Sequence, residues 1–162
     1  DRDIIVCVED ISERIATENQ LVTISQEYVI ASESAGIGIW KYDIVNDQLS
    51  WDKLMYQLYE VDAATFDCNY SSWRQLVHPD DLESLEQAFH LAIEQLSIFK
   101  YEFRVITPNG RIKHINTFAQ ILPDDNNHPH KVIGVNYDAT ERCEALLALE
   151  TSLKKTPNWL AS

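Results

Sequence analysis

The last third of the sequence most constrains the fold, because it carries three strand-like segments in succession. Residues 99–105 alternate aromatic or aliphatic side chains with charged ones, which is the period-two pattern of a half-buried strand. A Pro-Asn-Gly turn at 108–110 leads to a second segment at 111–122, and a polar loop leads to a third at 132–137. Short connections between consecutive strands favour an antiparallel sheet.

The preceding residues add two strands and a block of helices. Strand-like segments at 39–44 and 48–51 are joined by an Asn-Asp turn, and Asp52 is placed to cap a short helix. Residues 66–81 have the pattern of short helical turns, and Pro79 begins the longest helix. This order predicts an α+β domain, a five-stranded antiparallel sheet covered by helices on one face. Such a domain encloses either a chamber for a small ligand or a filled core.

Helices are also predicted on both sides of this domain. Residues 11–34 contain no Gly or Pro and repeat apolar side chains at helical spacing. At the other end, the strand at 132–137 runs into a helix, with Asp138 as the N-cap and Glu141 as the third residue of a capping box. Behind this cap, a stripe of leucines forms the seed of a coiled coil: Leu146, Leu149 and Leu153.

The same strand-and-cap pattern occurs near the start of the chain. An apolar segment at 4–8 precedes Asp10, Glu13 and Arg14, as the last strand precedes its own Asp-x-x-Glu-Arg cap. A repeat at a domain-sized distance indicates tandem modules of one kind, although this cap is also a common helix start. The predicted divisions are the last strand of a preceding module with its connecting helix, one whole domain and the start of a C-terminal signalling helix: residues 1–34, 35–142 and 143–162.

Composition excludes several classes of function. The net charge of −13 argues against nucleic acid and anionic membrane surfaces as partners. No apolar run approaches the roughly 20 residues of a membrane helix, and no signal peptide is present, so no membrane contact is predicted for this fragment. Cys7, Cys68 and Cys143 lack Cys-x-x-Cys spacing, which fits a reducing cytoplasm and predicts neither disulfides nor a zinc site. Hydrolase, metalloprotease and P-loop motifs are absent, so no catalytic residues are predicted.

Six local motifs follow one another between about residues 34 and 142. They are Gly36-Ile37-Gly38-Ile39-Trp40 with Tyr42-Asp43, Leu49-Ser50-Trp51, Trp73 with Val77-His78-Pro79-Asp80-Asp81, Tyr101-Glu102-Phe103-Arg104-Val105, Pro108-Asn109-Gly110, and Ile133-Gly134-Val135 with Asp138-Ala139-Thr140-Glu141-Arg142. In this order they resemble a PAS domain, of the subgroup common in bacterial sensor histidine kinases and cyclic-di-GMP enzymes. The opening segment at 10–14 is similar to the closing motif of a preceding PAS domain.

The resemblance implies sensing and signal transfer, without catalysis by this fragment. PAS domains dimerise through flanking helices, bind haem, flavin, small metabolites or nothing known, and pass changes through the last strand into a helical linker. The resemblance also implies a multidomain two-component or cyclic-di-GMP protein, whose kinase, diguanylate cyclase or phosphodiesterase output lies beyond Ser162. Asp138, Thr140 and Glu141 would then stand at the relay, although these residues alone indicate only a helix cap.

Individual residues test the cofactors that the resemblance brings in. Cysteine-adduct flavin chemistry needs an Asn-Cys-Arg-Phe motif, where this chain has Ser-Ser-Trp-Arg at 71–74 with Cys68 outside it, so that chemistry is rejected. Haem needs an axial histidine, but His90 lies partly off the apolar face of its helix, which disfavours haem. His128 and His130 are interpreted as residues of an acidic loop. No metal site is predicted, the cofactor is unknown, and a small metabolite stays open.

Two functions from different classes remain. In the first, the domain is a ligand-binding sensor with an aromatic chamber, in which tyrosine hydroxyls and an amide give polar specificity. In the second, it is a ligand-free relay module whose aromatic residues fill the core, while helices at 11–34 and 139–155 form a homodimer. The candidate pocket residues are Trp40, Tyr42, Met55, Tyr59, Trp73, Phe89, Phe103, Asn116 and Phe118.

Overall fold

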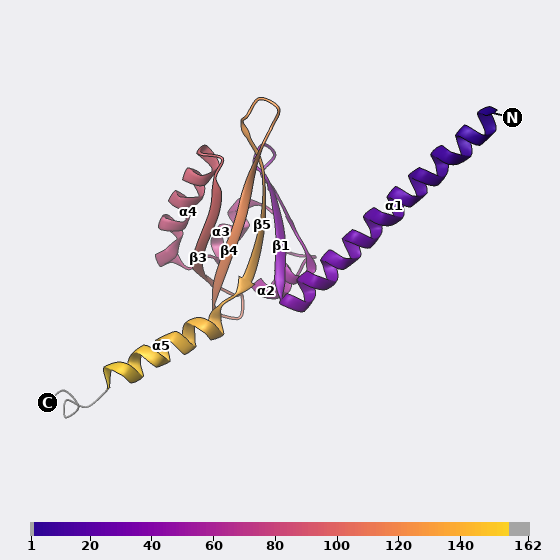
Figure 1. Cartoon of the computed structure of the whole chain (residues 1–162). Coiled ribbons are helices and arrows are strands. Elements are labelled where there is room, and N and C mark those ends of the chain that lie inside the picture. Colours follow the sequence, from indigo (N-terminus) through magenta and orange to yellow (C-terminus); the bar gives the residue numbers. More distant parts are fainter. Residues whose placement is uncertain (1, 156–162) are drawn as a thin grey trace. The chain divides into compact units, whose positions relative to one another are not determined.

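The computed structural model describes the backbone of residues 2–155 and the side chains of residues 11–155. The chain divides into two units between Ala35 and Gly36. The first holds the helix α1 (Arg2–Ala35), and the second holds the sheet domain with its exit helix α5 (Thr140–Lys154) (Figure 1). Gly36 separates the two units with a φ of 65°, a left-handed conformation that glycine adopts without steric strain.

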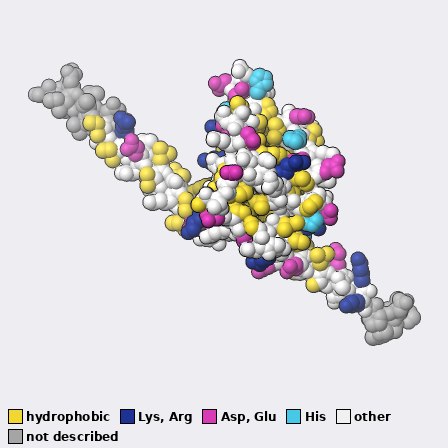
Figure 2. Space-filling model, turned by 180° about the vertical axis from the view of Figure 1, so that it is seen from behind, with side chains coloured by type: hydrophobic (Ala, Val, Ile, Leu, Met, Phe, Trp, Pro, Cys, Tyr) yellow, Lys and Arg dark blue, Asp and Glu magenta, His cyan; other side chains and the backbone are white. Residues whose placement is uncertain are grey.

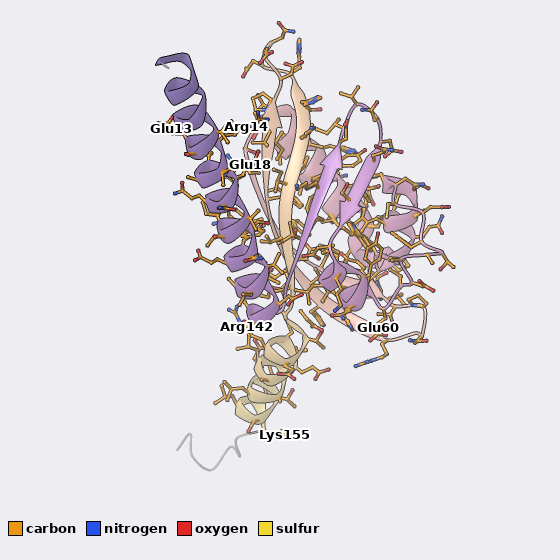
Figure 3. The ribbon with its side chains drawn as sticks, turned by 90° about the vertical axis from the view of Figure 1, so that its right-hand side faces the viewer. Glu13, Arg14, Glu18, Glu60, Arg142 and Lys155 are labelled. Carbon is orange, nitrogen blue, oxygen red and sulfur yellow. The ribbon has the colours of Figure 1, made fainter. Side chains whose placement is uncertain are left out.

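Helix α1 confirms the helix predicted at 11–34 and corrects the strand predicted at 4–8, which is helical. A strand must pair its backbone N–H and C=O groups with a neighbouring strand, whereas a segment without Gly or Pro satisfies them within a helix. Arg14 and Glu18 lie one turn apart on this helix (Figure 3), and their exposed side chains approach to 3.6 Å. That residues 1–34 end a preceding module stays a prediction.

Five strands form one antiparallel sheet in the spatial order β2-β1-β5-β4-β3, which confirms the predicted fold class. The strands are β1 (Ile37–Asp43), β2 (Gln48–Trp51), β3 (Ile98–Ile106), β4 (Ile112–Pro123) and β5 (Pro129–Asp138). The last strand, β5, lies at the centre between β1 and β4, so the strand that leads into α5 contacts both halves of the sheet (Figure 1).

Three helices pack against the sheet: α2 (Lys53–Tyr59), α3 (Tyr70–Leu76) and α4 (Pro79–Glu94) (Figure 1). Asp52 caps α2 as predicted, since its Oδ1 accepts the backbone N–H of Met55 at 2.8 Å. Asn69 caps α3 by accepting the N–H of Ser72 at 2.8 Å. His78 caps α4, whose Pro79 needs no hydrogen bond at the first helical position.

A close approach at the centre of the sheet fixes the position of the Trp40 ring. The indole lies over Gly134 on the neighbouring strand, and a Cβ at Gly134 would stand 2.3 Å from Trp40 Cε2. A Cβ at Gly38 would stand 2.8 Å from the flexible Met55 Sδ and 3.1 Å from the Met55 backbone N, so Gly38 is crowded less severely than Gly134. The two glycines therefore let large side chains of the core lie flat against the strands.

Candidate functional site

A cavity of about 40 Å³ lies between the sheet and helices α2, α3 and α4. On the scale on which a water molecule needs roughly 10–15 Å³, this volume holds about three water molecules, and an apolar cavity of roughly 150 Å³ accepts benzene. All five strands and all three helices contribute to its wall. The lining residues are Trp40, Tyr42, Leu49, Trp51, Met55, Tyr70, Trp73, Phe89, Phe99, Phe103, Thr117 and Asn136.

Six of the predicted pocket residues line this cavity: Trp40, Tyr42, Met55, Trp73, Phe89 and Phe103. The predicted Tyr59 is 1% exposed and lies behind the lining, where its hydroxyl contacts two lining side chains. Asn116 and Phe118 were predicted on the wrong face of β4. Thr117 is the buried neighbour, and Phe118 is 42% exposed on the opposite face, with Lys100 Nζ at 5.3 Å from its ring centroid.

A buried hydrogen-bond network forms the polar end of the cavity. Trp40 Nε1 donates to Asn136 Oδ1 at 2.8 Å, and Asn136 Nδ2 donates to Tyr59 Oη at 3.1 Å. Trp73 Nε1 donates to the same hydroxyl at 3.3 Å. An indole nitrogen can only donate, so Trp40 fixes which end of the Asn136 amide faces it. The network thereby ties β5 to β1, α2 and α3.

The tyrosines of this region stay uncharged at neutral pH. Burial, followed by the hydrogen bond to Asp47, raises the pKa of Tyr42 to about 12. Burial also raises the pKa of Tyr59 and Tyr70 above the ordinary value, and for Tyr70 the Glu86 carboxylate adds to the effect. The lining contains no Asp, Glu, Lys or Arg, so the cavity is neutral and mostly aromatic. It suits a small uncharged ligand.

The candidate haem ligand, His90, and the thiol nearest the flavin motif, Cys68, lie outside this lining. His90 is exposed on α4, with its ring centroid 6.5 Å from that of Tyr70. Cys68 contacts Tyr56 Oη at 3.0 Å. The described lining contains neither a histidine nor a cysteine.

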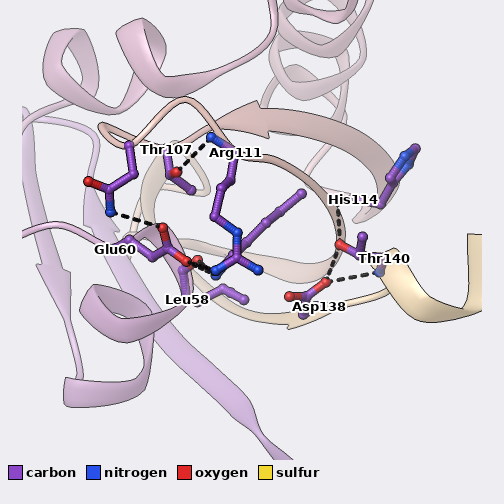
Figure 4. Close-up of polar contacts among 9 residues, drawn as sticks. Leu58, Glu60, Thr107, Arg111, His114, Asp138 and Thr140 are labelled. Carbon is purple, nitrogen blue, oxygen red and sulfur yellow. Dashed lines mark hydrogen bonds and ion pairs between the residues drawn. The ribbon is translucent and has the colours of Figure 1, made fainter. Parts of the chain in front are cut away.

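The junction between β5 and α5 holds the predicted relay residues. Thr140 Oγ1 donates to Asp138 Oδ1 and accepts the backbone N–H of His114 at 3.0 Å (Figure 4). Ala139, not Asp138, is the N-cap of α5, and no side chain caps it, so the predicted capping box is wrong by one residue. Asp138 instead closes a turn by accepting the N–H of Thr140 at 2.9 Å. Glu141 is exposed in the first turn.

A second polar cluster ties α2 to β4. Glu60 Oε1 lies 2.9 Å from Arg111 Nη1 (Figure 4) and 3.1 Å from Lys113 Nζ. Lys113 also donates to the carbonyl of Leu58 at 2.8 Å. The hydrogen bond from Lys113 holds the pKa of Glu60 below its ordinary value. Lys113 and His114 are consecutive, so adjacent residues of β4 hold the helix beside the cavity and the helix that leaves the domain.

Three side chains that could hold a metal ion meet near the start of α5. Glu102 on β3, His114 on β4 and Cys143 on α5 each offer one ligand atom, and these atoms lie within 4.8 Å of one another. Sequence spacing did not indicate this cluster, because its members come from three elements that only the folded chain brings together.

The predicted dimer leucines lie on the outside of α5. Leu146, Leu149 and Leu153 are 52%, 58% and 66% exposed, and the described length of α5 has no buried residue. Leu147, which is off the predicted stripe, is 59% exposed. Figure 2 shows apolar side chains along this helix among charged ones.

The fold and the sequence together define the class of protein. Residues 48–136 match the family described as PAS fold, and the chain belongs to that family. Over 134 residues, or 83% of this chain, the sequence is 32% identical to the protein of Escherichia coli (strain K12) named Probable diguanylate cyclase DgcE. The chain spans only 12% of the length of that relative.

Two solved structures show a similar fold. A sensory box histidine kinase/response regulator from Burkholderia thailandensis E264 has a TM-score of 0.69 at 20% identity, covering 79% of this chain and 95% of that one. The N-terminal domain of a diguanylate cyclase with PAS/PAC sensor from Marinobacter aquaeolei has a TM-score of 0.61 at 16% identity, covering 65% and 97%. Within residues 2–155, no helix has both the length and the apolar character needed to cross a membrane.

Proposed function

We propose that this PAS domain senses the state of its aromatic cavity and passes it through β5 into α5. The observation that carries the proposal is a short path along one strand. Asn136 joins the network at the polar end of the cavity, and Asp138, two residues later, bonds to Thr140 at the start of α5. A change that moves Asn136 along or across the sheet therefore acts directly on the residues that position the exit helix.

The ligand that fits this proposal is small, uncharged and mostly apolar. The neutral aromatic lining favours such a molecule, because a charge placed there would lose its hydration without gaining an ionic partner. At about 40 Å³ the cavity accepts only a few heavy atoms without side-chain movement. A larger ligand would displace Tyr70 and Trp73, the half-buried rings of the short helix α3.

A ligand-free relay is the second candidate. The small volume favours it, and so does the complete pairing of buried side-chain polar atoms among the described residues. Native mass spectrometry of the purified domain, compared with its denatured mass, separates the two candidates. Extra mass that is lost on denaturation supports the sensor, whereas a clean apo protein that also fails to bind small neutral aromatic compounds supports the ligand-free relay.

Hydrogen–deuterium exchange tests the relay itself. The change Asn136→Ala removes the link between Trp40 and Tyr59, and we expect faster exchange of the amides at 139–143. Leu85→Ala on α4 is the matched control, since Leu85 is 1% exposed and lies outside the network. If both variants, at equal loss of stability, speed exchange at 139–143 equally, there is no relay through β5.

Homodimerisation through the flanking helices belongs to the same proposal. The exposed stripe of Leu146 and Leu149 supports it, because apolar residues at this spacing pair in coiled coils. We expect the double change Leu146→Glu, Leu149→Glu to yield a monomer in light scattering after gel filtration. Leu147→Glu, equally exposed but off the stripe, should leave the dimer intact. Equal disruption by both changes would contradict the stripe.

We infer in addition that the full-length protein is a bacterial signalling protein with a diguanylate cyclase or histidine kinase output domain. The relative and the similar structures named above support this inference. A cytoplasmic location is part of the same proposal, and the free thiols of Cys68 and Cys143 are compatible with a reducing compartment. Assaying the full-length protein for diguanylate cyclase and autokinase activity would test the output.

A further inference from the structure

The cluster of Glu102, His114 and Cys143 lies outside the aromatic cavity and outside the path through Asn136. Glu102 and His114 lie on the hairpin of β3 and β4, and Cys143 lies in the first turn of α5. We propose that these three side chains bind a divalent cation of the Zn²⁺ type and so clamp the exit helix to the sheet. The proposal assigns a metal site to a part of the fold where sequence spacing indicates none.

The donor set matches the chemistry of zinc. A thiolate sulfur, an imidazole nitrogen and a carboxylate oxygen are the three ligand classes that Zn²⁺ uses in proteins, and water commonly fills the fourth tetrahedral position. Two anionic ligands and one neutral ligand balance the charge of a divalent ion. Calcium and magnesium prefer all-oxygen ligands, so sulfur and nitrogen donors select against them.

The spacing of the donor atoms is close to that of a metal site. With metal–ligand bonds of about 2.0–2.3 Å, the donors of a tetrahedral zinc site lie roughly 3.3–3.7 Å apart. Here Cys143 Sγ is 3.0 Å from Glu102 Oε1, and all three donors lie within 4.8 Å of one another. Glu102 is exposed and the other two side chains are half-buried, so rotamer changes can close the site without moving the core.

The present hydrogen bond indicates how a metal would bind. The Cys143 thiol donates to the Glu102 carboxylate, and this bond raises the pKa of the thiol. Binding would replace that proton: the S–H bond breaks, one proton goes to solvent, and the thiolate and carboxylate each donate an electron pair to the ion. Of the neighbouring cations, Arg142 favours the thiolate, while Arg104, the pairing partner of His114, is occupied by Asp81 at 2.6 Å.

The position of the site gives it a consequence for signalling, which rests on the function proposed above. His114 already holds α5 through its backbone N–H, which donates to Thr140 (Figure 4). A metal on its ring would add a second link to the same turn of α5, through Cys143. The bound ion would therefore restrain the exit helix whatever the state of the cavity.

Two other groups in the chain could also take up zinc and must be controlled. The loop between β4 and β5 carries His128 and His130 near Asp124, and His128 Nδ1 lies 3.7 Å from Asp124 Oδ2. Cys7 and Cys68 are the remaining thiols of the sequence. The test therefore uses the full chain with Cys7→Ser and Cys68→Ser as the reference protein.

Isothermal titration calorimetry with Zn²⁺ measures binding at this site directly. We expect one Zn²⁺ per reference chain, with proton release that varies with the ionisation enthalpy of the buffer. Cys143→Ser and His114→Gln should abolish this binding and Glu102→Gln should weaken it, whereas the double change His128→Gln, His130→Gln should leave it unchanged. No binding, binding that survives Cys143→Ser, or binding lost in the loop variant would overturn the proposal.

A second measurement avoids the risk that a variant misfolds. In the reference protein Cys143 is the only thiol, so Zn²⁺ should slow its alkylation by iodoacetamide, and Co²⁺ should give a thiolate-to-cobalt absorption band. Unchanged alkylation together with no such band would also overturn the site. No cavity ligand is added in either experiment, so a failure here leaves the proposed relay undecided, and a failed relay leaves the metal site standing.

Discussion

The polar end of the aromatic cavity and the β5–α5 junction are both hydrogen-bonded regions of one strand, but they differ in burial. At the cavity, Asn136 is 3% exposed and Tyr59 is 1% exposed. At the junction, Asp138 is exposed, and Thr140 and His114 are only half-buried. A buried polar group that loses its partner costs about 1–3 kcal/mol, whereas an exposed group exchanges its partner for water. The cavity end is therefore rigid, and the junction can rearrange at small cost.

In the proposed relay, this difference would let one strand both register a change at the cavity and pass it to α5. The rigid end holds Asn136 in a single orientation, so that a shift of the cavity wall moves the strand instead of being absorbed by rotamer changes. The exposed junction would allow α5 to begin in more than one way.

Gly134→Ala should have the largest effect, because the new Cβ would stand 2.3 Å from the Trp40 ring. We expect a loss of about 3 kcal/mol in the free energy of unfolding, measured by urea denaturation. Gly38→Ala is the matched control and should lose about 1 kcal/mol, since the flexible Met55 side chain can move away and the Met55 backbone N, at 3.1 Å, needs to shift only slightly. Equal losses for the two variants would mean that the Trp40 ring is not held in place.

Asn136→Ala should lose about 2 kcal/mol, because it leaves Trp40 Nε1 without its acceptor and Tyr59 Oη without one of its donors. Trp40→Phe removes the donor as well, so a double-mutant cycle with the two changes measures the coupling energy. A coupling near zero would contradict the rigid network and would make the cavity end as soft as the junction.

Thr140→Val should lose only about 1 kcal/mol, since it removes one acceptor for the His114 N–H and one donor to Asp138 at a half-exposed position. The expected change is local, with faster amide exchange at 139–143 and unchanged exchange around Trp40. Thr140→Ser keeps the hydroxyl and should behave like the native chain. If exchange around Trp40 rises as well, the two ends are a single cooperative unit.

Glu60→Gln, which alters the cluster that ties α2 to β4, should change how the free energy of unfolding depends on pH. The pKa of Glu60 is lowered in the folded state, chiefly by Lys113, so the unfolded chain takes up the proton first. The stabilisation that the charged Glu60 gives the folded state is complete above the ordinary pKa of 4.5. It is lost as the pH falls below that value. The variant should therefore lose less stability between about pH 5 and about pH 3 than the native chain.

The remaining acid sensitivity of the Glu60→Gln variant should come from Asp43, Asp81 and Asp124. Their pKa values are also lowered, chiefly by hydrogen bonds that they accept from Asn46, Arg104 and the His128 N–H respectively. Glu83→Gln, at an exposed carboxylate of α4, is the control and should keep the native pH profile. Identical profiles for the Glu60 and Glu83 variants would contradict the tie between α2 and β4.

Much of the fold could be predicted, because its elements have strong local signals. The alternation of residues 99–105, the cap at Asp52 and the Pro79 start of α4 each depend on a few adjacent residues, and each is found where expected. The strand at 4–8 was wrong, because strand formation depends on a partner strand and the same residues can form a helix. The capping box at Asp138 was wrong by one residue because β5 continues through it.

The candidate site was predicted less completely than the fold. Trp40 and Phe103 stand out as aromatic residues on clearly alternating strands, and both line the cavity. Asn116 and Phe118 were placed inside because β4 lacks clean alternation and an aromatic ring is usually buried. A small signal was available, since Thr117 and Ala119 share the parity of Ile115 and Ile121, and a wall facing bulky rings needs small side chains.

By itself, the sequence determined the order of strands and helices from residue 37 onward, the net charge of −13 and the aromatic content of the core, because these depend on composition and on neighbours along the chain. Only the tertiary structure decided which face of β4 meets the cavity, which amide pairs with Trp40, and that Glu102, His114 and Cys143 meet at the start of α5. The physical reason is that strand register and packing arise from contacts between distant residues, and a shift of one residue exchanges the two faces of a strand.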